Sequence, residues 1–159
     1  MREQAGEISV LVYHFRSPKS RRWYIVRVEE HPHHFYGIKF YLKSDTLNPH
    51  KFNKLSGLFE PRPVINTCIA ILMELASKNP EASFGFIGAN LIGESEQETK
   101  RFRVYKTILT TYFSEEQYLH YQILEKSAYA LISRSALNSN PDLIMQVSTY
   151  FSDNYSNFD

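Results

Sequence analysis

The sequence holds a single cysteine, Cys68, in 159 residues. One cysteine excludes a disulfide within the chain and a zinc site built from several thiolates. Long apolar runs are also missing, because the longest, CIAILM, is far too short to cross a bilayer. The N-terminal stretch MREQAGEISVLVYHF lacks a signal-peptide layout. We therefore expect a cytoplasmic protein without a membrane segment.

An excess of charge of one sign is absent too. The formal net charge is +1, which gives no global electrostatic reason for binding nucleic acid or membranes. The charge is nevertheless uneven, since residues 1–62 carry 11 Lys or Arg against 6 Asp or Glu, and residues 63–159 carry 7 against 11. This polarity could orient a partner or a head-to-tail contact between copies of the chain.

Aromatic residues are abundant. Eleven Tyr, eleven Phe and one Trp make up 14% of the chain, more than a core of this size usually needs. We expect some of these rings to line a surface that meets a protein partner or another copy of the chain. The length fits one domain spanning residues 1–159, with frayed ends at 1–6 and 152–159.

The hydrophobic pattern alternates between strand and helix signals. Residues 7–15, 22–30 and 35–43 predict an antiparallel meander of three strands. The remaining predicted elements are a helix at 62–80, a strand at 83–89, a helix at 96–113, two strands within 117–134 and a helix beginning at Asn140-Pro141. The order βββ-α-β-α-ββ-α predicts an α+β fold, with a mainly antiparallel sheet of about six strands packed by three helices.

The stretch ASFGFIGANLIGESEQETKRFRVYK has the strand, glycine loop and helix order of a phosphate-binding loop. Its three glycines, at positions 85 to 93, match neither common fingerprint, and no Lys-Ser or Lys-Thr pair follows. Three glutamates between positions 94 and 98 crowd the helix start, where they would repel a phosphate. We interpret the glycines as a turn after a buried strand, and we predict no cofactor.

Histidines cluster at His31, His33 and His34, and alternate positions on an extended chain can share a metal ion. No Asp or Cys with metal-ligand spacing lies nearby, so we predict no metal site, although whether this cluster binds metal stays open. The cluster could also confer pH sensitivity. Catalytic residues are not predicted either, because Cys68 falls on the apolar face of a helix and no serine lies in a glycine-flanked elbow.

Two surfaces combine basic and aromatic residues. In the meander we predict a binding face with Trp23, Arg27, Lys39 and Tyr41, to which the basic connection RSPKSRR is joined. Rings and cations on a sheet face can stack bases and neutralise phosphates. An ordinary half-exposed sheet is the alternative. The second predicted surface is the helix face with Arg101, Arg103, Tyr105 and Lys106, for which a solvated, salt-bridged face is the alternative.

The segments SKNPEASFGFIGA, ETKRFRVYKTI and YALISR together resemble small uncharacterised bacterial protein families of the Bacteroidetes type. The resemblance covers roughly residues 62–134, and it implies a compact α+β domain of unknown function in which Arg101, Arg103 and Tyr105 occupy the shared motif. It implies no reaction.

These patterns leave three hypotheses open. The first is a non-catalytic binding or protein-interaction domain, which could self-associate. The second is a nucleic-acid-associated protein, of the kind found in defence or toxin–antitoxin systems, with weak nucleic-acid binding. The third is an enzyme whose cleft leaves no local signature.

Overall fold

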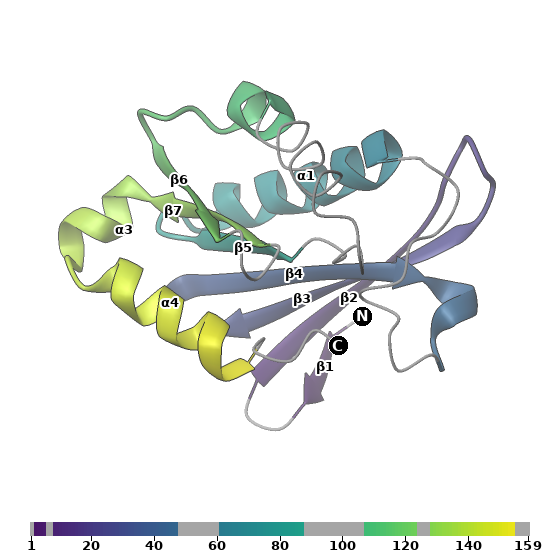
Figure 1. Ribbon diagram of the computed structural model, residues 1–159, viewed down its shortest axis with the longest axis horizontal. Coiled ribbons are helices and arrows are strands. Elements are labelled where there is room, and N and C mark those ends of the chain that lie inside the picture. Colours follow the sequence, from purple (N-terminus) through teal and green to yellow (C-terminus); the bar gives the residue numbers. More distant parts are fainter. Residues whose placement is uncertain (1, 6–7, 48–60, 88–106, 124–127, 155–159) are drawn as a thin grey trace.

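The computed structural model describes residues 2–5, 8–47, 61–87, 107–123 and 128–154 (Figure 1). These residues form one mixed sheet with helices packed on both faces. The predicted α+β fold with a mainly antiparallel sheet is therefore confirmed.

Seven strands form the sheet in the order β1-β2-β3-β4-β5-β7-β6. In chain order they are β1 (Arg2–Ala5), β2 (Ile8–Arg16), β3 (Trp23–His31), β4 (Phe35–Leu42), β5 (Ser83–Ile87), β6 (Tyr118–Ile123) and β7 (Ala128–Ser133). Neighbouring strands run antiparallel except β4 and β5, which run parallel. A parallel pair needs a long crossover, and the segment containing α1 (Pro61–Lys78) supplies it.

Strand β1 lies in the segment that was expected to fray. Arg2–Ala5 pairs with β2 from Leu11 back to Ile8, so the sheet has one strand more than the six expected. The sequence REQA has no apolar alternation, and its pairing therefore rests on backbone hydrogen bonds to β2. At the other end of the chain, α4 (Leu143–Asn154) also extends into the predicted frayed segment.

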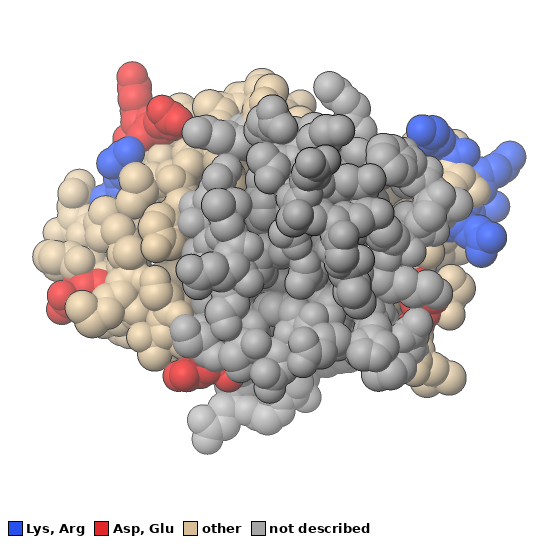
Figure 2. Space-filling model, in the orientation of Figure 1, with Lys and Arg blue, Asp and Glu red and all other residues tan. Residues whose placement is uncertain are grey.

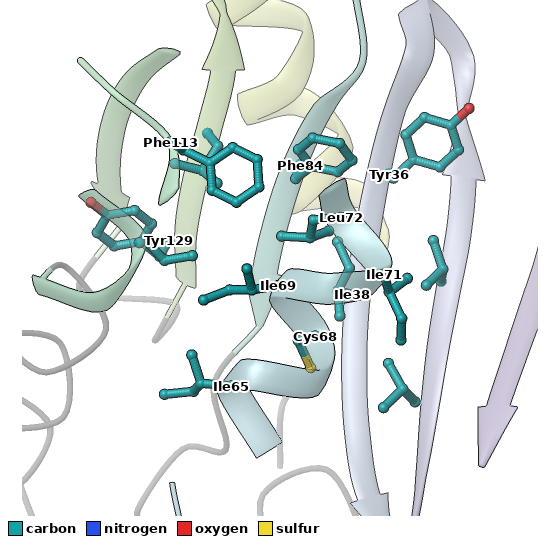
Figure 3. Packing of buried hydrophobic residues seen from close by; sticks show 14 of the residues in the cluster. Tyr36, Ile38, Ile65, Cys68, Ile69, Ile71, Leu72, Phe84, Phe113 and Tyr129 are labelled. Atoms are coloured by element: carbon teal, nitrogen blue, oxygen red, sulfur yellow. The ribbon is translucent and has the colours of Figure 1, made fainter. Parts of the chain in front are cut away.

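The larger part of the core lies between α1 and one face of the sheet (Figure 3). Helix α1 turns Ile65, Cys68 and Leu72 inward at three- and four-residue steps, as its sequence period predicts. Ile38 of β4 and Phe84 of β5 face them from the sheet. Residues 107–112 form a second helix over the same face, and Phe113 directly follows it; residues 96–106 of the predicted helix at 96–113 lie outside the described residues.

The other face is covered at one end by α3 (Arg134–Ser139) and α4. Helix α3 was not predicted; its start is capped by Ser133, whose hydroxyl accepts a hydrogen bond from the amide of Ala136 at 3.2 Å. Helix α4 begins later than the predicted start at Asn140-Pro141. The side-chain amide of Asn140 donates to Gln146 Oε1 at 2.7 Å, and the helix begins at Leu143.

Candidate functional site

The predicted binding residues of the meander share one face of the sheet. Register places Ile25 opposite Tyr41 and Arg27 opposite Lys39, and directly opposed residues in antiparallel strands point to the same side. The period-two pattern therefore assigned these side chains to the correct common face.

The middle of this face is not an open surface. Tyr41 is only 7% exposed, because it packs with Ile25 of β3 and with Val10 and Val12 of β2. Lys39 is largely buried, and its Nζ lies 2.8 Å from Glu29 Oε1. The expected exposed cluster of Trp23, Tyr41 and Lys39 is therefore not formed. The half-buried Arg27 lies opposite Lys39 in the same region.

The end of the face is accessible. Trp23 begins β3 and is 48% exposed, Arg16 lies opposite it on β2, and Lys43 follows β4 with its Nζ 6.0 Å from the centroid of the Trp23 ring. Three neighbouring chain segments thus place the indole ring of Trp23 in one row between the cations of Arg16 and Lys43. Period two in the sequence also places Lys43 on this face, although neither Lys43 nor Arg16 was among the predicted binding residues.

The β2–β3 turn continues this row with further cations. We name the exposed set the basic hairpin end: Arg16, Lys19, Arg21, Arg22, Trp23 and Lys43. Figure 2 shows the largest group of visible Lys and Arg atoms at the place of this hairpin in Figure 1. Segments 16–23 and 42–47 carry five cations, and Asp45 is their single carboxylate. The local charge therefore differs strongly from the net charge of +1.

Hydrogen bonds hold the turn in one shape. The buried Ser17 accepts through its hydroxyl from the amides of Lys19 and Ser20, at 3.2 and 3.4 Å. The Arg16 Nε donates to the carbonyl of Arg21 at 2.9 Å, across the hairpin. Arg21 has a φ of 63°, a left-handed conformation that non-glycine residues rarely adopt. The turn therefore presents its cations from a preorganised backbone.

The second predicted surface cannot be placed. Arg101, Arg103, Tyr105 and Lys106 lie outside the described residues, as do Gly88 and Gly93 of the glycine-rich stretch.

The three clustered histidines contact different partners. His31 is 4% exposed, and its ring lies 5.8 Å from the ring centroids of both Phe35 and Tyr150, which are 6.5 Å from each other. His33 lies on the exposed side, 6.2 Å from the Tyr150 ring, and His34 accepts a hydrogen bond through Nδ1 from the Asn79 amide at 2.9 Å. Among the described residues no group of three His, Cys, Asp or Glu side chains could hold a metal ion.

His120 of β6 and Tyr129 of β7 form a hydrogen-bonded pair that the sequence did not indicate. The pair also contacts Phe113, which directly follows the helix at 107–112. His120 Nε2 lies 2.7 Å from the carbonyl of Phe113, so this nitrogen carries the hydrogen and donates. In neutral His120 the other nitrogen, Nδ1, then accepts from the Tyr129 hydroxyl. Burial, with a smaller contribution from Glu115, raises the pKa of Tyr129 to about 12. A phenol that stays protonated is suited to this donor role.

The described part of the chain offers little for catalysis. Burial raises the pKa of the Cys68 thiol to about 12, which keeps it protonated and unreactive. An open hollow is lined, among the described residues, by Thr107, Thr110, Thr111 and Glu115, of which Glu115 alone is ionisable. These described lining residues do not bring several titratable groups together, as an enzyme cleft would.

No protein-family model matches the chain, and searches of curated proteins and of solved structures found no match either. The resemblance to Bacteroidetes-type families stays a prediction. None of the described helices is long and apolar enough to cross a membrane.

Proposed function

We propose that the protein is a non-catalytic binding domain of the cytoplasm that holds an acidic partner against the basic hairpin end. The observation that carries the proposal is the exposed Trp23 between Arg16 and Lys43, on a turn that adds three more cations. Half-exposed indole is unusual on a surface without a partner, and Trp and Arg are the residues that contribute most to binding interfaces.

Electrostatics and order both support this surface. Cations gathered on one protrusion attract a negatively charged partner from a distance, although the whole chain is almost neutral. Because the hydrogen bonds of Ser17 and Arg16 already fix the turn, binding would lose little backbone entropy.

Retention on heparin, a polyanion without bases or peptide groups, tests the proposal. We expect wild-type protein to bind and Arg22→Glu to elute at clearly lower salt, because the reversal places a carboxylate in the patch. Lys78→Glu is the matched control: it changes the net charge equally, but at the exposed end of α1, and should elute near the wild type. Equal shifts for both variants would contradict a localised site.

Self-association is a second candidate, favoured by strand β6. This strand ends the described sheet, and its sequence YLHYQI holds neither Pro nor a charged residue to discourage pairing. The backbone amide of Arg134 donates to the carbonyl of Gln117 at 3.0 Å. Because hydrogen-bonded pairs recur at every second residue of an antiparallel ladder, Leu119 and Tyr121 of β6 are also hydrogen-bonded to β7. The main-chain groups of His120 and Gln122 therefore point away from β7, toward the outer edge.

If two copies pair through β6, Tyr121→Lys should convert a dimer into a monomer in sedimentation velocity, because Tyr121 is 41% exposed and lysine blocks edge pairing. Tyr112→Lys, at an exposed position on the helix at 107–112, should leave the mass unchanged. A wild-type monomer at micromolar concentration would remove this candidate.

A further inference from the structure

The basic hairpin end has an indole ring at its centre, which gives a flat aromatic surface on which a nucleic-acid base can stack. We propose that the partner is single-stranded nucleic acid, with Trp23 as a stacking platform for a base and the surrounding cations as phosphate contacts. This inference rests on the proposed function and names its ligand class.

The geometry fits the two parts of a nucleotide. Trp23 offers flat aromatic area at 48% exposure, and every base has a face that can stack on it. Arg16 and Lys43 stand on the neighbouring segments on either side of the ring, where they can pair with the phosphates that flank a stacked base. Lys43 is exposed and attached through a flexible stem, so its ammonium group can turn from the ring to a phosphate.

The turn extends the phosphate path beyond the stacked base. Arg21 and Arg22 are exposed in the β2–β3 turn, and the hydrogen bond from Arg16 to the carbonyl of Arg21 ties the turn to β2.

Single-stranded nucleic acid fits this site because its bases are free to stack on the Trp23 ring, whereas those of a duplex are already paired and stacked. Because the net charge of the whole chain is only +1 and the cations of this site form a local patch, binding should be moderate and strongly salt-dependent.

Trp23 is the only tryptophan of the chain, and its fluorescence therefore reports on this site alone. We expect a 12-nucleotide oligothymidylate to quench it in a saturable titration. An abasic strand of the same length carries the same phosphates without bases, and it should bind more weakly and without quenching. A duplex of the same length should also leave the fluorescence largely unchanged.

Variants are compared by the anisotropy of a labelled oligothymidylate. Trp23→Ala should weaken binding by about 5- to 150-fold, the range for loss of one stacked base, whereas Trp23→Phe should keep most of the affinity. Arg22→Glu should weaken binding and reduce the slope of log affinity against log salt by at least about 0.7, the value for one phosphate contact on a single strand. Thermal unfolding of each variant confirms that the exposed substitutions leave the fold intact.

The outcomes separate this inference from the proposed function. Retention on heparin that depends on Arg22, together with no quenching and equal affinity for the abasic strand or for polyglutamate, would overturn the nucleic-acid inference and leave the acidic-partner proposal in place. Absence of both retention and quenching would overturn both. Quenching by the oligothymidylate that is lost at high salt supports both.

Discussion

Phe84→Ala is expected to lower the free energy of unfolding by about 3–5 kcal/mol, the usual cost of removing a fully buried phenylalanine ring. Phe84 is completely buried in β5, between β4 and β7. Its ring centroid lies 6.0 Å from that of Tyr36 and 6.2 Å from that of Phe113, and α1 packs over the same region (Figure 3). The ring therefore packs between the meander and the segment that follows the helix at 107–112.

Urea unfolding followed by circular dichroism measures this effect. Met73→Ala is the control, because it also removes a large apolar side chain, but from a half-exposed position of α1. It should change stability by no more than about 0.5 kcal/mol. A loss below about 1 kcal/mol for Phe84→Ala would contradict the close packing of sheet and helices around this ring.

The elements that the sequence predicted well are those with a strong local pattern. The three meander strands and α1 begin and end within two residues of their predicted bounds, because alternation and helical spacing are visible in short windows. The elements that it missed carry no periodic apolar signal. Strand β1 is stabilised by pairing with β2, and α3 is a short helix whose start is capped by Ser133.

The site was predicted in part, for the same reason. Period two placed Trp23 and Tyr41 on one face, but the burial of Tyr41 depends on Val10 and Val12, which strand pairing brings beside it. Exposure could be predicted only for Trp23, because it stands at the end of its strand, where the apolar neighbours end. The histidines show the same limit, since the surroundings of His31 are set by Tyr150 of α4, far along the chain.

Lowering the pH from 7.0 to 5.5 is expected to destabilise the protein through His31. Burial, in part beside the rings of Phe35 and Tyr150, lowers the pKa of His31 below its ordinary value of 6.5; Glu29 acts in the opposite direction, and Lys39 adds to the lowering. Well above pH 6.5 His31 is neutral in both states and contributes no pH dependence. Below that value the unfolded chain binds the proton more strongly than the folded one, so stability falls until the lowered pKa is reached.

The slope from one such group is at most about 1.4 kcal/mol per pH unit, and less where water screens the charge. His31→Phe keeps an aromatic ring beside Phe35 and Tyr150 but cannot be protonated, so its stability should be nearly constant over the same pH range. The control His14→Gln removes an exposed imidazole from β2 and should keep the wild-type slope. Urea unfolding at each pH distinguishes the variants. An unchanged slope in His31→Phe would show that another group senses the pH, whereas its loss would show that the stability of the fold depends on neutral His31.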